Sequence, residues 1–367
     1  MVEPMLKKED MGKVQTINHC LKAEICPLPP LAAHLPWGEE LDKILSLTSG
    51  GKLDDLLNPV LFAPILDLTA RPSKKIRGQL VEVTYQLVTP IHLRSRATLA
   101  SCWVCGHIVE LIHAGSLVID DIQDGSLVRR GRPALHRQYG LPVALNAGNW
   151  LYFWPLQLLG DLNLPAEKEL ALYRAYQRTL LRAHFGQALD VGLRMDRLDQ
   201  ECVRAACYAS MELKTGALIA LASVMGAVLG GACEKAVAAL EQFGHAFGVA
   251  LQMFDDLGNL SSRRDPGKRF EDLLLRRPSW VWACAAEGLT TKNYEQFMSV
   301  VYRLPDAGPL EHWLAKNDLA SQARSRAEEH LAGSYEELER HLGAKSIEPL
   351  ALRRLRALGE RIAEAYD

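Results

Sequence analysis

Apolar side chains recur every three or four positions along most of the chain from about residue 41, which is the spacing of amphipathic helices. The alternation of apolar and polar residues that is typical of strands is scarce. Glycine and proline separate one apolar stretch from the next. The pattern therefore predicts one large all-α domain over 41–367. The expected helical stretches are 76–90, 96–124, 142–161, 166–193, 200–212, 215–230, 234–260, 279–286 and 321–341.

Two segments depart from this pattern. Residues 1–40 lack a helical period and carry four prolines between positions 27 and 36, so we expect an irregular N-terminal extension. The stretch 215–232 has 18 residues without a charge, close to the length of a membrane span. Its many alanines and glycines, and Ser223 among them, favour a buried core helix, and we expect no membrane span.

Composition narrows the classes of function. The formal net charge of −2 gives no general basic field, so we expect no nucleic-acid partner. Cys102 and Cys105 lie in an apolar stretch without a matching second pair, which favours buried free thiols over a zinc site. Charged residues at 7–10 interrupt any secretory signal near the start, and the cytosol is the expected compartment.

The most informative chemistry lies in two aspartate motifs that begin 135 residues apart. The first, Asp-Asp-Ile-Gln-Asp, runs from Asp120 to Asp124, and the second, Asp-Asp-Leu-Gly-Asn, runs from Asp255 to Asn259. In each motif the first and last side chains are four positions apart and share a helix face. Clustered carboxylates repel one another, and Mg²⁺, which prefers oxygen ligands, would relieve that repulsion. Two such patches that face each other would bind a diphosphate between them.

Basic residues accompany the first motif. His113 lies two helical turns before the first aspartate and shares its face. Arg129 and Arg130 follow the motif, and guanidinium groups match phosphate oxygens in pairs. Lys74 and Arg77 lie near a predicted helix start, where the helix dipole favours anions. An aspartate pair alone is more often a helix cap or a solvated face, but these basic residues favour a diphosphate site.

Together the motifs resemble those of the trans-isoprenyl diphosphate synthases over roughly residues 55–300. The first motif with the Arg-Arg-Gly-x-Pro run from Arg129 carries most of the resemblance. The Asn-Ala-Gly-Asn element from Asn146 and the terminal Asn259 are similar to the eukaryotic type of geranylgeranyl diphosphate synthase. The resemblance implies an orthogonal helical bundle around a central substrate cavity. It also implies a homodimer with three Mg²⁺ ions per site that condenses isopentenyl diphosphate with an allylic diphosphate to a C20 product.

The resemblance also implies roles for single positions. The implied Mg²⁺ ligands are Asp120, Asp121, Asp124, Asp255, Asp256 and Asn259, and the implied catalytic residues are Asp120, Asp121, Asp124, Lys214 and Asp255. The implied isopentenyl diphosphate ligands are Lys74, Arg77, His113 and Arg130. The implied contacts of the allylic substrate are Arg129, Lys214 and Arg277, with Gln187, Thr215 and Gln252 as further binding residues and Asp190 as part of the same Gly-Gln-x-x-Asp element as Gln187.

Product length depends, by the same resemblance, on the helix of the first motif. Gly115 and Ser116 lie about one turn before the motif and are small, which leaves a channel open for the growing chain. Ile112 or Ile108, or another helix, is expected to form its floor. We therefore expect a C20 product, and a shorter product from Gly115→Phe or Ser116→Phe.

Three departures from the family pattern leave alternatives open. Ser73 replaces a glycine before the lysine, Arg277 followed by Pro278 replaces a late lysine, and Asn259 is a weaker Mg²⁺ ligand than aspartate. One alternative is a terpene cyclase on the same scaffold, which needs no isopentenyl site. The other is a non-catalytic partner subunit, which can lose its aspartates. The four basic isopentenyl positions and the retained aspartates favour the condensing enzyme.

Overall fold

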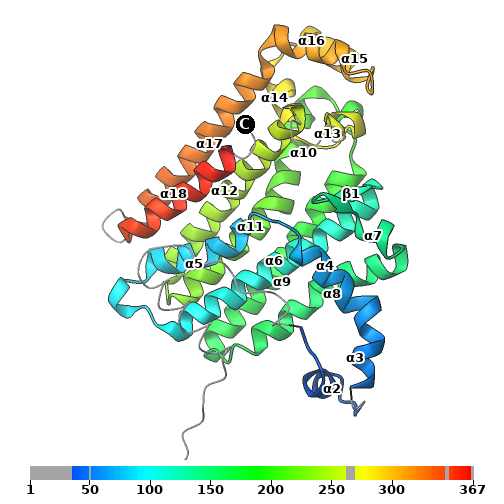
Figure 1. The fold of residues 1–367 in the computed structure, drawn as a ribbon. Coiled ribbons are helices and arrows are strands. Elements are labelled where there is room, and N and C mark those ends of the chain that lie inside the picture. The colour runs from blue at the N-terminus through cyan, green and yellow to red at the C-terminus, as the bar shows by residue number, and fades with distance from the viewer. Residues whose placement is uncertain (1–34, 49–50, 262–268, 344–346, 365–367) are drawn as a thin grey trace, which may run out of the picture.

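The computed structural model describes residues 35–48, 51–261, 269–343 and 347–364, and these are almost entirely helical (Figure 1). The all-α prediction is therefore confirmed. Most of the predicted N-terminal extension, 1–40, lies outside the described residues.

The nine stretches expected from the apolar period all correspond to observed helices, with ends that agree within two residues. The stretch 96–124 coincides with α6 because Ser95 caps its N-terminus, where Thr98 N donates to Ser95 Oγ at 3.0 Å. Gly125 ends this helix with a left-handed φ of 65°. The helices that match the predicted stretches are α5 (Ile76–Val88), α6 (Arg96–Asp124), α8 (Leu141–Gly160), α9 (Ala166–Gly192), α10 (Gln200–Met211), α11 (Ala217–Leu229), α12 (Glu234–Ser261), α14 (Trp280–Gly288) and α17 (Leu319–Leu342).

The apolar period missed short elements and those near the ends of the chain, because a short helix offers too few repeats to detect. It also missed a two-stranded antiparallel hairpin that follows α6. The missed helices are α2 (Glu39–Leu45), α3 (Lys52–Leu57), α4 (Ala63–Ala70), α7 (Leu135–Gln138), α13 (Glu271–Leu275), α15 (Thr291–Val301), α16 (Gly308–Asn317) and α18 (Pro349–Glu364). The single turns and strands are η2 (Asn58–Phe62), η3 (Ile91–Leu93), η4 (Met195–Arg197), η5 (Glu212–Gly216), β1 (Val128–Arg129) and β2 (Arg132–Pro133).

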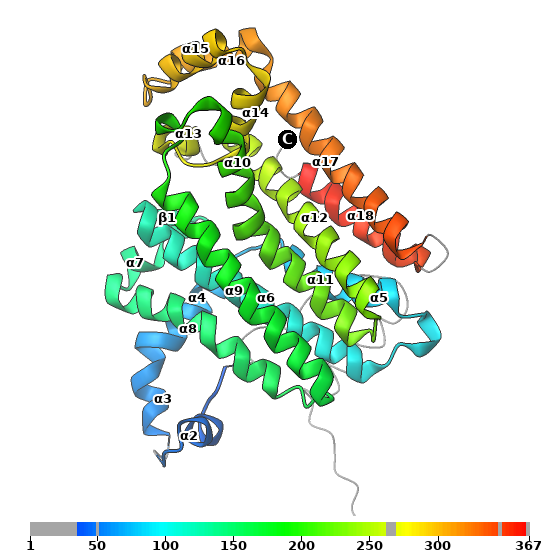
Figure 2. The same cartoon turned by 180° about the vertical axis from the view of Figure 1, so that it is seen from behind.

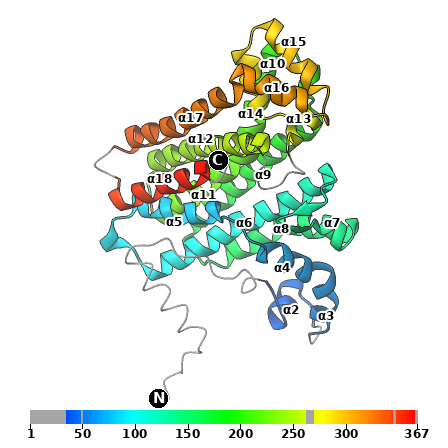
Figure 3. The same cartoon turned by 45° about the horizontal axis from the view of Figure 1, so that its top comes forward.

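The core lies around α11, whose residues are all buried. It packs against α5, α9 and α12, while α6 packs on α8 and α12 on α17. Figure 3 shows α17 on one side of α11 and α12, with α6 and α8 on the other. Gly226 and Gly244 permit the close crossings of α11, because a Cβ at Gly226 would lie 2.3 Å from Val81 O and one at Gly244 would lie 2.5 Å from Ala220 Cα.

Within the part of the chain that the structure describes, two helical segments are long and apolar enough to cross a membrane by length and composition alone. They are α6 and the segment Gln200–Leu229, of which 67% and 78% respectively of the apolar window is buried inside the structure. The second segment contains most of the expected core helix, and its burial fits that interpretation. The absence of a membrane span and the cytosolic compartment stay predictions.

Candidate active site

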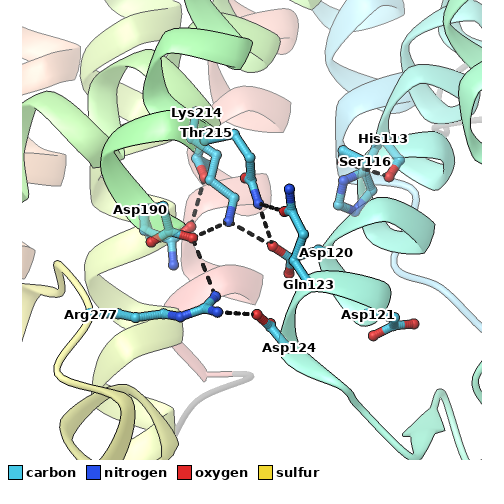
Figure 4. Close-up of polar contacts among 12 residues, drawn as sticks. His113, Ser116, Asp120, Asp121, Gln123, Asp124, Asp190, Lys214, Thr215 and Arg277 are labelled. Atoms are coloured by element: carbon cyan, nitrogen blue, oxygen red, sulfur yellow. Dashed lines mark hydrogen bonds and ion pairs between the residues drawn. The ribbon is translucent and has the colours of Figure 1, made fainter. Parts of the chain in front are cut away.

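The first aspartate motif occupies the last turn of α6. A helix C-terminus carries partial negative charge, so carboxylates there need cationic partners. Arg129 of β1 supplies one, since its Nε donates to Asp121 Oδ1 at 2.9 Å. Asp120 and Asp124, one turn apart, instead face α9, η5 and the segment before α14 (Figure 4). Asp121 therefore orients Arg129, and the direct metal role of all three aspartates stays a prediction.

Two cations from across the cleft approach the remaining aspartates of this motif (Figure 4). Lys214 Nζ lies 3.0 Å from Asp120 Oδ1 and 2.7 Å from Asp190 Oδ2. Arg277 pairs with Asp124 and lies 3.8 Å from Asp190 Oδ2. Asp190 of α9 therefore receives both cations. One network of ion pairs connects the end of α6 to three other elements of the bundle.

The Gly-Gln-x-x-Asp element of α9 makes this network possible. A Cβ at Gly186 would lie 2.5 Å from Lys214 N, so only glycine allows η5 to approach so closely. Gln187 Nε2 donates to Asp120 Oδ1 at 3.0 Å. Lys214 itself lies in η5, a π-helical turn, and such turns are frequent at functional sites. Thr215 Oγ1 follows it and lies 2.6 Å from the Gln252 Oε1 atom that accepts its hydrogen bond.

The charges in the network shift the pKa values of its members. Burial alone would lower the pKa of Lys214, but the Asp120 and Asp190 carboxylates raise it above its ordinary value. Burial would raise the pKa of Asp120, yet Lys214 and the Gln187 amide lower it. Burial and then the charge of Asp120 raise the pKa of Asp124 to about 6, although a nearby guanidinium opposes this. Burial and the charge of Asp120 thus outweigh the Arg277 guanidinium at Asp124, and a cation on this face of α6 would relieve that repulsion.

A cavity of about 430 Å³ opens beside Asp120, between the start of α5, the middle of α6, the hairpin and α12. Burial, and then the nearby arginines and Lys214, lower the pKa of His113 well below its ordinary value, so its ring is neutral. A neutral imidazole N–H can still donate to a phosphate oxygen. The predicted site residues that line the cavity are Lys74, Arg77, His113, Ser116, Asp120, Arg129, Arg130, Lys214, Thr215, Gln252 and Asp255.

The second motif contains two aspartates with different roles. Asp255 lines the cavity, whereas Asp256 is buried. Trp280 N donates to Asp256 Oδ2 at 2.6 Å, and Gln252 Nε2 donates to Asp256 Oδ1 at 2.8 Å. Asp256 therefore caps the N-terminus of α14. Asp256 thus has a structural role in the folded chain, and its role as a direct Mg²⁺ ligand stays a prediction. Asn259 lies one turn beyond Asp255, and its metal role stays a prediction.

The protein oxygens that face the cavity would supply only part of the coordination shell of Mg²⁺. Among the residues that the structure describes, no group of three or more His, Cys, Asp or Glu side chains is arranged to hold a metal. Mg²⁺ usually takes one or two carboxylates and completes its octahedral shell with water and substrate phosphate. Asp120 and Asp255, which line one cavity with basic residues, fit that mode of binding.

The chain-length prediction needs one correction. A Cβ at Gly115 would lie 2.8 Å from Gly148 O and 3.0 Å from Leu151 Cβ, both on α8. Gly115 therefore allows α6 and α8 to pack closely and does not open the cavity. Ser116 lines the cavity as expected. Ile112 is buried, and its role as a channel floor stays a prediction.

Two residues near the site escaped the sequence motifs. Asp272 of α13 is half-buried, and burial followed by the charges of Asp190 and Asp255 raises its pKa to about 7. It belongs to a helix of five residues, where no periodic signal marks it. Ile362 of α18 lines the cavity although it lies more than 100 residues after the second motif. Both positions depend on how distant segments pack.

The sequence comparisons agree with this geometry. Residues 58–308 match the family model described as polyprenyl synthetase. The chain is 32% identical over 214 residues to a geranylgeranyl diphosphate synthase of Sulfolobus acidocaldarius, which covers 57% of this chain and 62% of that protein. It is also 32% identical over 203 residues to geranylgeranyl pyrophosphate synthase 2 of Zymoseptoria tritici, covering 55% of this chain and 56% of that one. The match thus spans less than two thirds of these relatives.

Solved structures support the fold. A farnesyl diphosphate synthase from T. brucei superposes with a TM-score of 0.73 at 17% identity, covering 96% of this chain and 99% of that one. A geranylgeranyl pyrophosphate synthetase from Pyrococcus horikoshii superposes with a TM-score of 0.68 at 21% identity, covering 85% of this chain and 94% of that one. Because this family model matches more than half of the chain, residues 58–308, the chain belongs to the polyprenyl synthetase family.

Proposed function

We propose that this protein condenses isopentenyl diphosphate with an allylic diphosphate to form a C20 trans-prenyl diphosphate. The observation that carries the proposal is one cavity lined both by Lys74, Arg77 and His113 and by Asp120 and Asp255. Two diphosphates need two binding groups, one of basic side chains and one of carboxylates that hold metal ions. A terpene cyclase on the same scaffold needs only the second group. The basic group therefore favours condensation, as do the names of the similar synthases.

On the acidic side, Asp120, Asp124 and Asp255, with Asn259, would hold Mg²⁺, three ions per site by family resemblance. Bound Mg²⁺ supplies Lewis-acid stabilisation of the leaving diphosphate. Lys214 and Arg277 already face this group and would donate to phosphate oxygens as negative charge develops on them. Asp121 holds Arg129 in place for the same diphosphate.

On the basic side, Lys74, Arg77, Arg130 and the neutral His113 would hold isopentenyl diphosphate. This position brings its double bond to reacting distance from the allylic carbon. The allylic C–O bond breaks, the isopentenyl double bond forms the new C–C bond, and one proton leaves to the departing diphosphate. The chemistry needs no protein nucleophile.

The test is a product assay. Purified protein is incubated with Mg²⁺, radiolabelled isopentenyl diphosphate and farnesyl diphosphate, and the products are separated by chromatography. A labelled, longer prenyl diphosphate supports condensation. Hydrocarbon made from farnesyl diphosphate alone supports the cyclase alternative and overturns the proposal. A protein that is inactive when assayed by itself but stimulates a separate active synthase supports the partner-subunit alternative.

We also propose that Tyr152 and His184 limit product length. Tyr152 of α8 lies beside Gly115 of α6. A Cβ placed at Gly115 would lie 3.5 Å from Tyr152 Cε1. Burial and then the charge of Asp120 raise the pKa of Tyr152 to about 12. His184 of α9 packs edge-on against Tyr152, with ring centres 5.3 Å apart. We infer that a chain growing from Asp120 along α6 would meet these two rings.

Tyr152→Ala should therefore lengthen the product, because it removes a ring from the end of the channel. Ser116→Phe should shorten it. Gly115→Phe should lower the melting temperature instead, because it clashes with α8. Products are dephosphorylated and measured by chromatography, with Tyr173→Phe on α9 as a control that keeps the wild-type length. Unchanged lengths in both Tyr152→Ala and Ser116→Phe would refute this placement.

The apolar surface of α8 and α9 supports the expected homodimer. Leu145 and Phe153 of α8 are 41% and 68% exposed, and Leu181 and Phe185 of α9 are 56% and 66% exposed. The two helices contact one another and lie together on the face seen in Figure 2. An exposed apolar patch of this kind marks an interface, and a second copy of the same face would cover it with two-fold symmetry.

Phe153→Asp combined with Phe185→Asp should convert the dimer into a monomer, because each places charge in the proposed interface. Sedimentation velocity measures the mass of both proteins. Leu93→Asp is the matched control, since Leu93 is 64% exposed on η3. A wild-type protein that sediments as a monomer would contradict the dimer.

A further inference from the structure

A buried arginine lies next to the candidate isopentenyl site. Arg71 directly precedes the Pro-Ser-Lys run that lines the cavity, and only 3% of its surface is exposed. A buried guanidinium is stable only when it has partners. Arg71 Nη1 donates to Arg129 O at 2.9 Å, and Arg71 Nη2 pairs with Asp67 one turn earlier on α4. Arg71 thus joins the end of α4 to the backbone of the hairpin.

Asp67 makes a second connection to the same hairpin. It also pairs with Arg132 of β2, and the Asp67 side chain is only 8% exposed. Arg130 Nη1 lies 3.5 Å from the carbonyl oxygen of Leu68, the next residue of α4. The Asp67 carboxylate therefore neutralises two guanidinium groups. One is that of Arg71, which precedes the Pro-Ser-Lys run, and the other is that of Arg132 on the hairpin.

The two segments that meet here carry the basic side chains of the isopentenyl site. Like charges at short distance repel one another, and burial makes the repulsion stronger. Burial lowers the pKa of Arg130, and Arg129, Arg77 and Arg71 lower it further although Glu110 opposes them. Folding these segments side by side therefore needs an anion within the protein, and Asp67 provides it.

We propose that Asp67 and Arg71 are positioning residues that hold the loop of Lys74 and the hairpin of Arg130 together as one preformed diphosphate site. Neither residue is among the described residues that line the cavity, so they act through the backbone of the two segments. Preorganisation of this kind raises affinity because the ligand no longer has to order the loops. The proposal rests on the proposed function for the identity of the diphosphate, which is isopentenyl diphosphate.

The test compares Asp67→Asn, Arg71→Gln and the double variant with wild type. Each single variant should raise the KM for isopentenyl diphosphate about tenfold, because small displacements of charged groups weaken binding strongly. The KM for the allylic diphosphate should change less, since Asp121 still holds the Arg129 side chain. The double variant should be no worse than the more affected single variant, because both remove one clamp. A merely structural role would lower the active fraction and leave both KM values unchanged.

Two controls keep the test decisive. Arg178→Gln breaks a surface ion pair with Glu241 and should leave both KM values at wild type. Melting curves identify folded variants, and Asp67→Asn, which keeps the size of the side chain, replaces Arg71→Gln if the latter unfolds. An unchanged KM for isopentenyl diphosphate in a folded variant would overturn the proposal.

Titration with inorganic diphosphate by calorimetry separates this proposal from the proposed function. If wild type makes no condensation product, the proposed function fails, but the clamp is still tested. About tenfold weaker diphosphate binding in Asp67→Asn than in wild type supports the clamp. Equal binding refutes it.

Discussion

Asp120→Ala should lower turnover by about 10³-fold while the helix content measured by circular dichroism stays unchanged. The substitution removes a carboxylate that faces the cavity from the end of α6. It also removes one of the two anions that hold the Lys214 ammonium, whose Nζ lies 3.0 Å from Asp120 Oδ1. Lys214 keeps Asp190 at 2.7 Å, so the fold loses little. The loss should therefore fall on the chemical step.

A matched control is Asp161→Ala at the exposed end of α8, where the carboxylate accepts a hydrogen bond from Gln157 Nε2 at 3.0 Å. Its turnover should equal that of wild type. Titration with Mg²⁺ gives a second readout, because a lost ligand raises the concentration of metal needed for half-maximal turnover. Near-normal turnover and an unchanged Mg²⁺ requirement in Asp120→Ala would remove the first motif from the proposed site.

The sequence predicted the helices of the bundle well because long helices repeat the apolar period many times. The exact agreement at α6 also depends on Ser95 and Gly125, which are visible cap residues. The hairpin of β1 and β2 escaped prediction because two-residue strands carry no period. The short helix α13 escaped for the same reason, and Asp272 with it.

Within the site, the sequence identified the motifs but not the direction of each side chain. Spacing places Asp120 and Asp124 on one helix face, and the structure directs both to the cleft. The next residue, Asp121, lies about 100° around the helix, and its partner Arg129 is known only from the folded hairpin. The same limit applies to Gly115, since small size alone does not show whether a cavity or another helix faces it.

The network at the cleft also explains why charged residues from separate helices form one site. Asp190 accepts from Lys214 and lies within ion-pair distance of Arg277, although the three residues come from separate elements. These contacts place both cations beside Asp120 and Asp124. A diphosphate that enters the cleft would therefore meet donors whose positions are already fixed, which reduces the reorganisation that binding requires.

The two aspartates of the second motif should respond to substitution in opposite ways. Asp255→Ala should lower turnover by about 10²-fold or more with an unchanged melting temperature, because the side chain lines the cavity. Asp256→Ala should lower the free energy of unfolding by roughly 2 kcal/mol, because it leaves Trp280 N–H buried without its acceptor. Thermal melts and turnover per folded molecule measure the two effects separately.

The asparagine variants sharpen this contrast. Burial raises the pKa of Asp256 well above its ordinary value, so a neutral side chain is tolerated at this position. Asp256→Asn keeps an oxygen that accepts from Trp280 N but places an amide N–H opposite Gln252 Nε2, so its melting temperature should fall by less than that of Asp256→Ala. Asp255→Asn should still lose most of its turnover, because an amide is a weaker Mg²⁺ ligand than a carboxylate. Equal loss of turnover in both asparagine variants would show that Asp256 also contributes to metal binding. Its role as a helix cap alone would then not explain the lost turnover.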